Sequence, residues 1–452
     1  MYRSERHLIF KDFSTHISRG QIRYLAAGHL DILEQKRKGT GFREAVSGRR
    51  FIDGFSSAGC FNVGRGNHGI IRALTDGLED IDMGSPDLLS PARTAFAIKL
   101  AAACPGDLNR VVFAGSGADA IEAALKLARG ATGREKIISM EKAYHGHSGF
   151  SLSANGKDYY KDLFQPLIPG FPLAPFGDLE ALARLIDDQT AAIILEPIQG
   201  EGGIHVANDN YLAGLRELCD THGTLLIFDE IQTGFGRTGR LWASEHSGVV
   251  PDLMVLAKSI GGGVYPNAAV VHRDIPLLTD FREANPGFHR SSGGGTPLGC
   301  QVSSAVLDYL TENNVCENAA AMGKRMIRGL EALQDKYPAI IREVRGRGMM
   351  IGIEYGEEYM GVLMADCLAR NGMFAVYSGN APQVMRFQLP LTASADEIDH
   401  AIVTVEKAIR LMRLYLRLLS PVTVFPAGRR LLNNQSFLVA VNNILRWFEI
   451  PR

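Results

Sequence analysis

LLIFDEIQTGFGRTG, residues 225–239, joins an apolar run to a polar, glycine-broken turn. The run LLIF is typical of a buried strand, and the acids Asp229 and Glu230 follow it directly. A carboxylate at the end of a buried strand is costly unless a cation or a hydrogen-bond donor meets it. The stretch therefore predicts a specific partner for Asp229, whereas it indicates none for Glu230.

Apolar runs of the same kind recur on both sides of this stretch, from about residue 70 to residue 275. Helix-length segments separate them, which is the pattern of a parallel sheet covered by helices on both faces, so we expect an α/β fold. Ligands of such sheets bind at the carboxyl ends of the strands, where polar residues follow several of these runs. One site built from several strand ends is therefore predicted. The expected strands are RVVFAG (110–115), KIISM (136–140), AAIILEP (191–197), TLLIFDE (224–230) and DLMVLAK (252–258).

The composition is that of an ordinary globular protein. The 452 residues are enough for a large core and for more than one structural unit. There are 48 basic and 49 acidic residues, and 46% of the chain is hydrophobic. Because no overall charge favours nucleic acid, we expect small-molecule partners and no nucleic acid.

The sequence changes character after the glycine-rich SSGGGTPLG, residues 291–299. A long helical stretch precedes the strand-like runs 345–355 and 384–391, and this order predicts a smaller α+β unit. The hairpin-like segment 42–59 is expected to be part of the same unit. The basic and apolar residues 413–452 predict an amphipathic packing helix, with a partner or a membrane surface as the alternative contact. The expected division is an N-terminal segment of the small domain (1–60), a large domain (61–298), the C-terminal small domain (299–412) and a C-terminal extension (413–452).

The six cysteines are scattered, without metal-ligand spacing and without a dense disulfide framework. They favour a reducing setting and no bound metal. The N-terminus MYRSERHLIFKDF lacks the apolar run of a signal peptide, and no window reaches the ~18 apolar residues of a membrane-spanning helix. We therefore expect a cytoplasmic protein without a membrane span.

GSGADAIEAALKLAR, residues 115–129, predicts a helix that begins directly after a strand, with apolar positions at helical spacing. The small residues Ser116, Gly117 and Ala118 then lie at the helix N-terminus, where free N–H groups and the helix dipole favour a phosphate. A tight turn without a ligand is the alternative. The segment matches neither the dinucleotide-binding glycine motif nor the P-loop motif, which disfavours those two sites.

YHGHSG, residues 144–149, places an aromatic ring, two histidines and two glycines beyond the run 136–140. Two histidines separated by one residue, with no third ligand nearby, give poor support for zinc. An aromatic face on which a flat ligand stacks is at least as well supported.

Lys258 stands directly between the apolar run DLMVLA and three glycines. Most lysines are solvated surface charges, and that is the alternative here. An amine held at the end of a sheet among apolar neighbours can instead capture a carbonyl group. Schiff-base chemistry is therefore a hypothesis for this residue.

The motifs together resemble the class III (omega-type) aminotransferases of pyridoxal phosphate fold type I. The resemblance covers roughly residues 40–412, and its most specific feature is DEIQTGFGRTG with Lys258 placed 29 residues after Asp229. It implies a large domain with a mainly parallel sheet flanked by helices, a smaller α+β domain, and pyridoxal 5'-phosphate as cofactor. The motifs are GSGADA, YHG, EPIQGEGG (196–203), FDEIQTGFGRTG (228–239), LAKSIGGG and SSGGGTPLG.

The resemblance also implies how the cofactor is held. Lys258 would form a Schiff base with it and then move a proton between the substrate carbon and the cofactor. Asp229 would pair with the protonated pyridine nitrogen, which keeps the ring an electron sink. Gln232 would hydrogen-bond the phenolic oxygen, and Tyr144 would stack on the ring face. The remaining cofactor-binding residues implied are Ser116, Gly117 and Ala118 at the phosphate, together with His145 and Glu196.

Substrate and partner contacts are implied in the same way. Ser292 occupies the position where the family usually has a threonine that reaches the phosphate of the neighbouring subunit, which implies a homodimer with shared active sites. Arg386 matches the arginine that grips the α-carboxylate of the substrate, for which its planar fork is suited. Glu201 matches the acid that pairs with this arginine when no carboxylate is present. A structural salt bridge is the alternative for Arg386.

Three positions depart from the family pattern. His147 stands where members that act on 4-aminobutyrate or ornithine commonly have an arginine, which favours a substrate with a neutral amine end or a diamino acid bound differently. Gly293 replaces a usual bulky aromatic residue, and Thr296 a usual asparagine. These smaller side chains at the dimer seam predict a roomier pocket.

We expect an aminotransferase that moves an amino group between a primary amine (a diamine, diamino acid or other ω-amine) and a keto acid such as 2-oxoglutarate or pyruvate. A decarboxylase or an aminomutase on the same scaffold is one alternative. It would differ only in which bond of the substrate aligns with the π system of the cofactor ring. A noncatalytic protein with this fold is another, although a structural role has no need for Asp229, Gln232 and Lys258 together. A nucleotide-dependent dehydrogenase is disfavoured, because the sequence lacks the dinucleotide-binding glycine motif.

Overall fold

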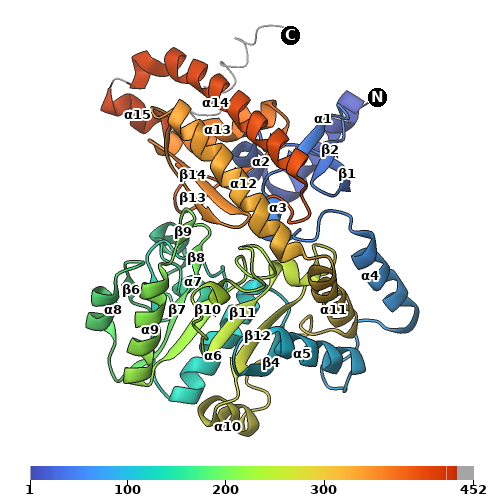
Figure 1. The fold of residues 1–452 in the computed structure, drawn as a ribbon, viewed down its shortest axis with the longest axis vertical. Helices are drawn as coiled ribbons and strands as arrows, with labels where there is room; N and C mark the ends of the chain where they lie inside the picture. Colours follow the sequence, from blue (N-terminus) through green and yellow to red (C-terminus); the bar gives the residue numbers. More distant parts are fainter. Residues whose placement is uncertain (1, 424, 435–452) are drawn as a thin grey trace.

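A computed structural model describes residues 2–423 and 425–434. The lower half of the molecule in Figure 1 is built around a seven-stranded sheet in the order β4-β12-β11-β10-β7-β5-β6. β10 (Leu225–Asp229) is buried along its whole length and pairs in parallel with β7 (Thr190–Leu195) and β11 (Leu253–Leu256). β12 runs antiparallel to both of its neighbours, so the sheet is mainly parallel, as expected. The other strands are β4 (Leu108–Ala114), β5 (Lys136–Met140), β6 (Leu173–Ala174) and β12 (Ala268–Arg273).

Helices cover both faces of this sheet. Successive side chains of a strand point to opposite faces, and in β10 Ile227 packs with α6 (Gly117–Thr132) while Leu226 and Phe228 pack with α9 (Asp209–His222). This double cover explains why the strand reads as a continuous apolar run. The buried positions of α6 include the predicted Ile121, Ala124, Leu125 and Ala128. The other helices around the sheet are α5 (Pro91–Ala103), α8 (Leu179–Leu185), α10 (Pro276–Ala284) and α11 (Pro297–Glu312).

A four-stranded antiparallel sheet in the order β13-β14-β17-β16 lies above the large one in Figure 1. It places Arg386 of β17 opposite Gly352 of β14. Its elements and the helices beside it are β13 (Ile341–Arg347), β14 (Met350–Tyr355), β16 (Val376–Tyr377), β17 (Val384–Phe387), α12 (Val315–Lys336), α13 (Glu358–Arg370) and α14 (Ala395–Thr423).

The N-terminal segment forms a third sheet in the order β1-β2-β3-β15. The expected hairpin is present as β2 paired with β3, and β1 extends it. β15 comes from the C-terminal third of the chain and pairs in parallel with β3. Strands from the N-terminal segment and from the C-terminal third therefore share one sheet. These strands are β1 (Glu34–Lys38), β2 (Gly41–Glu44), β3 (Arg50–Asp53) and β15 (Met373–Phe374).

The predicted C-terminal extension begins inside α14 and continues into α15 (Pro426–Leu432). Tyr415 and Leu419 are buried while Leu414 and Leu418 are exposed, so this part of α14 is amphipathic. Residue 424 and residues 435–452 of the extension lie outside the described residues. Over the described residues, no helix is long and apolar enough to cross a bilayer.

The remaining short elements connect these layers. They are α1 (Tyr2–Phe13), η1 (Ser14–Ser18), α2 (Arg19–Ala27), α3 (Ser56–Gly59), α4 (His68–Asp80), α7 (Gly149–Ser153), η2 (Asp158–Tyr160), η3 (Asp162–Phe164), β8 (Ile198–Gln199), β9 (His205–Val206), η4 (Ala243–His246) and η5 (Lys258–Gly261).

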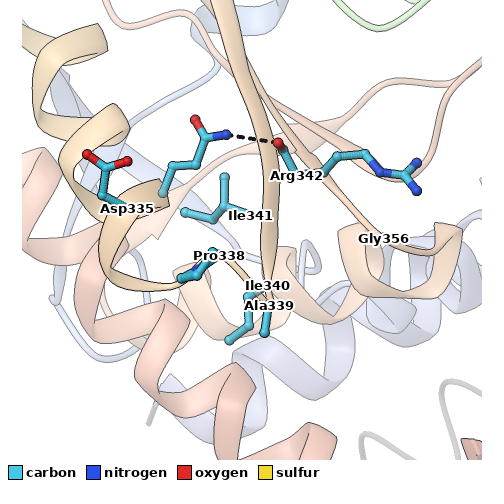
Figure 2. Close-up of a pocket in the computed structure, with 8 residues that line it drawn as sticks. Asp335, Pro338, Ala339, Ile340, Ile341, Arg342 and Gly356 are labelled. Carbon is cyan, nitrogen blue, oxygen red and sulfur yellow. Dashed lines mark hydrogen bonds between the residues drawn. The ribbon is translucent and has the colours of Figure 1, made fainter.

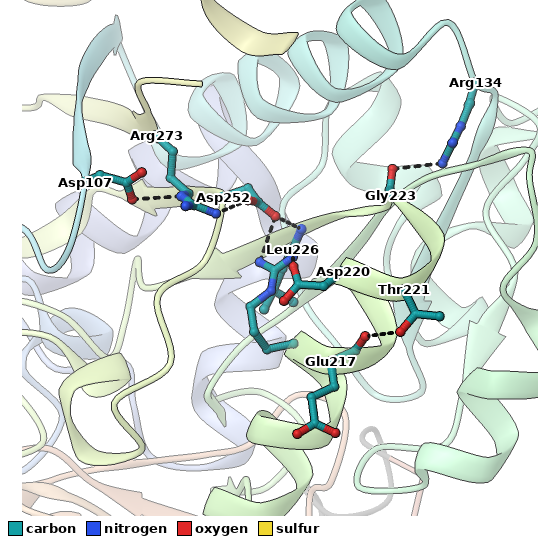
Figure 3. A network of polar contacts seen from close by, with 10 residues as sticks. Asp107, Arg134, Glu217, Asp220, Thr221, Gly223, Leu226, Asp252 and Arg273 are labelled. Carbon is teal, nitrogen blue, oxygen red and sulfur yellow. Dashed lines mark hydrogen bonds and ion pairs between the residues drawn. The ribbon is translucent and has the colours of Figure 1, made fainter. Parts of the chain in front are cut away.

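A buried acid ties the amino ends of the strands together (Figure 3). Asp252 directly precedes β11 and accepts hydrogen bonds from Leu226 N at 2.7 Å, Arg216 Nη1 at 2.8 Å and Arg273 Nη1 at 3.2 Å. These donors come from β10, α9 and the end of β12. Because this network lies at the edge opposite the carboxyl ends of the strands, its charges belong to the scaffold.

A hollow of about 560 Å³ opens where α12 turns into β13 (Figure 2). Gln334 Nε2 donates to Arg342 O at 2.8 Å across it. The hollow contains none of the predicted site residues. Its lining residues are Gln334, Asp335, Pro338, Ala339, Ile340, Ile341, Arg342 and Gly356.

Candidate active site

The carboxyl ends of β4, β5, β7, β10 and β11 open onto one cavity of about 310 Å³. Ten of the predicted site residues line it: Gly117, Ala118, Tyr144, His145, His147, Glu196, Glu201, Asp229, Gln232 and Lys258. Gly146, Ile231 and Ala257 complete the lining. Of the other predicted residues, Ser116 caps α6, Arg386 lies behind Glu201, and Ser292 is exposed on the loop before α11.

The start of α6 is built to hold an anion. Ser116 is the N-cap, and its Oγ accepts from Asp119 N at 3.2 Å. Helix geometry leaves the N–H groups of Gly117 and Ala118 without intrahelical acceptors, and the positive end of the helix dipole adds to them. A Cβ on Gly117 would stand 3.1 Å from Ile231 Cδ1. The small residue therefore keeps open a cradle that a phosphate fits.

Two groups of the protein contact the Asp229 carboxylate. Its Oδ2 lies 2.7 Å from His145 Nδ1, and its Oδ1 accepts from Ile231 N at 3.0 Å. Asp229 is only 4% exposed and His145 is 2% exposed. Asn155 Oδ1 accepts from the backbone N of His145 at 2.7 Å, which fixes the histidine in turn. The result is a rigidly held acid on the cavity wall, suited to a protonated ring nitrogen.

Glu230, the acid next to Asp229, points away from the cavity. It accepts from Ala243 N and Ser244 N, each at 2.8 Å, and from Thr233 Oγ1 at 2.9 Å. The carboxylate therefore ties the turn after β10 to the start of η4. Burial raises the pKa of Glu230. Its role is structural, which the local sequence did not indicate.

Glu196 connects two loops at the cavity. It accepts from Tyr144 N at 3.1 Å and from Gly200 N at 2.8 Å. Burial raises the pKa of Glu196 to about 7. The contact fixes the backbone that carries the Tyr144 ring.

Lys258 opens η5 with a left-handed φ of 48°. A residue other than glycine rarely adopts this conformation, and such residues cluster at functional sites. The side chain is half-buried and lines the cavity, and among the described residues no group hydrogen-bonds its Nζ. The amine is therefore available for a carbonyl group.

Arg386 and Glu201 form the predicted pair. Arg386 Nη1 donates to Glu201 Oε1, and Glu201 Oε2 accepts from Gly379 N at 2.7 Å. The guanidinium is buried, lies over the Phe55 ring at 4.9 Å and donates from Nη2 to Tyr377 O at 3.2 Å. The guanidinium is thus paired with Glu201, a carboxylate that lines the cavity.

Three aromatic rings meet edge to face, and two of them, Tyr144 and His147, line the cavity. Tyr144 and His147 have ring centroids 5.4 Å apart, and Tyr160 lies 5.7 Å from Tyr144 and 5.3 Å from His147. Edge-to-face rings at these distances stabilise one another. His147 therefore belongs to an aromatic wall.

Besides Gly146 and Ala257 of the cavity lining, three residues of the site were not predicted as site residues. Ile231 lines the cavity two residues after Asp229, and Tyr160 comes from η2, where no periodic pattern could indicate it. Gln388 donates from Nε2 to Gln232 Oε1 at 2.9 Å. Gln388 lies directly after β17 and meets Gln232 across 156 residues, so no local pattern indicated it.

A lysine, an acid, a glutamine and a phosphate cradle at the carboxyl ends of a mainly parallel sheet define a pyridoxal phosphate enzyme of fold type I. The chain belongs to the class III aminotransferases: the family model described as Aminotransferase class-III matches residues 24–409. A protein of Archaeoglobus fulgidus, named an uncharacterized aminotransferase, is 39% identical over 392 residues, which is 87% of this chain and 91% of that protein.

Solved structures agree with this assignment. An ornithine aminotransferase from Toxoplasma gondii ME49 superposes with a TM-score of 0.84 at 29% identity, covering 90% of this chain and 96% of that one. A thermostable (S)-enantioselective omega-transaminase from Thermomicrobium roseum gives 0.81 at 29% identity, covering 90% and 98%. The protein is therefore a pyridoxal-phosphate-dependent aminotransferase that moves an amino group between an amine and a keto acid.

Proposed function

We propose that this aminotransferase takes its amino group from a primary amine whose reacting end is remote from a carboxylate or has none. Diamines, diamino acids and other ω-amines are the class, with glutamate and 2-oxoglutarate or alanine and pyruvate as the second couple. The observation that carries this proposal is the Arg386–Glu201 pair at the cavity. The aromatic wall, with His147 in place of a second arginine, supports it.

The roles of the cofactor-facing residues are part of the proposal. Pyridoxal phosphate, when bound, supplies an electron sink for the charge left on the substrate carbon. Lys258 Nζ would hold the cofactor covalently and, once the substrate amine has displaced it, would move the proton to and from that carbon. Asp229, oriented by His145, would hold the proton on the ring nitrogen, and Gln232 would donate to the ring oxygen. Ser116, Gly117 and Ala118 would hold the phosphate, and Glu196 would position Tyr144 to stack on the ring.

Arg386 acts as a switch between two kinds of substrate. With a carboxylate-free amine, Glu201 stays on the guanidinium, so no charge is left unpaired in a buried place. When a keto acid enters, its carboxylate takes the fork and Glu201 moves aside. One site thereby accepts both substrates.

Arg386→Ala tests this function. We expect kcat/KM for the keto acid to fall about 10²-fold, because charge-assisted hydrogen bonds to the carboxylate are lost. The reaction of a carboxylate-free amine should change far less. Single-turnover absorbance with each substrate separates the two, and a panel of amines against pyruvate and 2-oxoglutarate identifies the couple.

A matched control is Arg342→Ala, which removes a largely exposed arginine from β13 and should change neither half-reaction. Equal losses with both kinds of substrate in Arg386→Ala would contradict the switch. Carbon dioxide release without keto-acid consumption would contradict transamination as the physiological reaction.

We infer that the active enzyme is a homodimer. Leu88 and Leu89 are exposed apolar residues on the segment between α4 and α5. Arg93 ties this segment to the Ser292 loop, since it donates from Nε to Gly295 O at 2.6 Å and from Nη1 to Leu88 O at 3.2 Å. A second copy of the chain would cover this apolar patch beside Ser292. Ser292 would then reach the phosphate of the cofactor bound in that second copy.

Leu89→Asp should therefore yield monomers with weakened cofactor binding, because the charge would be buried against the second copy. Light scattering and cofactor absorbance measure both effects. Ala213→Asp on the exposed face of α9 is the control. A dimer that survives Leu89→Asp with full cofactor would contradict this interface.

We also propose that the enzyme works in the cytoplasm. All six cysteines lie in the described part of the chain, and none forms a disulfide. Such cysteines suit a reducing compartment. Fluorescence microscopy of a tagged chain in its own cell would test this, and a secreted protein would contradict it.

A further inference from the structure

Gln388 is a fully buried amide beside the cavity. Its side chain is 0% exposed, and its Nε2 donates to Gln232 Oε1 at 2.9 Å. The backbone around it is fixed as well, because Gln388 N donates to Gly54 O at 2.7 Å. An amide held in this way can set the orientation of its neighbour.

The contact determines which end of Gln232 faces the cavity. A glutamine amide has an acceptor end and a donor end. Since Gln388 uses the acceptor end of Gln232, the NH2 group is the end left for a ligand. Gly200 leaves room for this amide, because a Cβ there would come within 2.2 Å of Gln232 Oε1.

Gln388 itself gains little stability from its position. Its Oε1 is buried and has no hydrogen-bond partner among the described residues. A buried acceptor without a partner is unfavourable, and an apolar side chain of the same shape would avoid that penalty. A polar residue here is therefore better explained by its contact with Gln232 than by packing.

We propose that Gln388 is a positioning residue, which holds the NH2 group of Gln232 toward the ring oxygen of bound pyridoxal phosphate. This inference rests on the proposed role of Gln232. Gln388 lies directly after β17, two residues beyond Arg386. The segment that presents Arg386 to the substrate carboxylate thus also orients the amide that faces the cofactor.

The proposal has a spectroscopic consequence. A donor at the ring oxygen spreads the negative charge of that oxygen, so the neighbouring Lys258 nitrogen holds its proton less strongly. Without the donor, the nitrogen holds its proton more strongly. The pH midpoint of the cofactor absorbance therefore moves upward. For one charge-assisted hydrogen bond we expect a shift of about one pH unit.

The test is a pH titration of the visible absorbance of the holoenzyme. Gln388→Met should raise the midpoint by most of the shift that Gln232→Met causes, and the double variant should show no further shift. Gln383→Met makes the same chemical change beside the start of β17 and should keep the wild-type midpoint. Cofactor content and melting temperature check that each variant is folded.

The outcomes separate the two claims. An unchanged midpoint in Gln388→Met, or shifts that add fully in the double variant, would overturn the positioning role. An unchanged midpoint in Gln232→Met would instead overturn the proposed role of Gln232. If Gln388→Met fails to bind cofactor, Gln388→Leu is titrated in its place. A wild-type midpoint in that holoenzyme, or loss of cofactor there as well, counts against the proposal.

Discussion

Alanine at position 258 is expected to lower the rate of amino transfer by at least about 10³-fold. The cavity offers the Lys258 amine at the end of β11, in a left-handed conformation that aims it inward. Removing it takes away both the covalent attachment of the cofactor and the group that moves the proton. Keto-acid-dependent consumption of an amine, followed at saturating pyridoxal phosphate, measures the loss.

Lys324→Ala is the control, because it removes an exposed lysine from α12. Its rate should stay within about twofold of the wild type, as for most surface substitutions. A Lys258→Ala enzyme that keeps a tenth of the wild-type rate would show that another group performs the proton transfer.

Asn in place of Asp229 is expected to reduce kcat by roughly 10²-fold, with part of the cofactor still bound. A carboxylate beside the ring nitrogen favours the protonated form of that nitrogen and raises its pKa by about 1–3 units. An amide of the same shape carries no charge and does not raise this pKa. His145 would remain nearby, so the loss reflects charge more than shape. Turnover at saturating cofactor, together with the absorbance of bound cofactor, separates rate from occupancy.

Glu230, the acid next to Asp229, should respond differently to the same kind of substitution. Glu230→Gln would place an NH2 group against the N–H of Ala243 or Ser244. We expect it to lower the free energy of unfolding by about 1–3 kcal/mol, while the folded enzyme keeps its rate. If Asp229→Asn instead lost stability and kept its rate, the two acids would have the opposite roles.

The sequence predicted the elements that local patterns encode. The spacing of apolar residues indicated the helix that begins at Gly117, and the continuous apolar runs indicated β4, β5, β7, β10 and β11. The antiparallel direction of β12 was not predicted, because an apolar run does not reveal strand direction. The domain boundaries at residues 60, 298 and 412 remain a prediction.

Within the site, the predicted residues that follow strand ends could be found because a parallel sheet brings its carboxyl ends together. Residues that act through contacts distant in sequence could not. Glu230 binds a turn 13 residues further on, and Gln388 meets Gln232 across 156 residues. Tyr160 joins the aromatic wall from an irregular segment that only the folded chain places there.

Borohydride reduction of the purified protein after incubation with pyridoxal phosphate, followed by peptide mass mapping, tests the central assignment most directly. A visible chromophore should be bleached, and the mass increment of the reduced cofactor should lie on the peptide that carries Lys258. Absence of a reducible chromophore, or an increment on another lysine, would contradict the assignment of Lys258 and with it the partner proposed for Asp229.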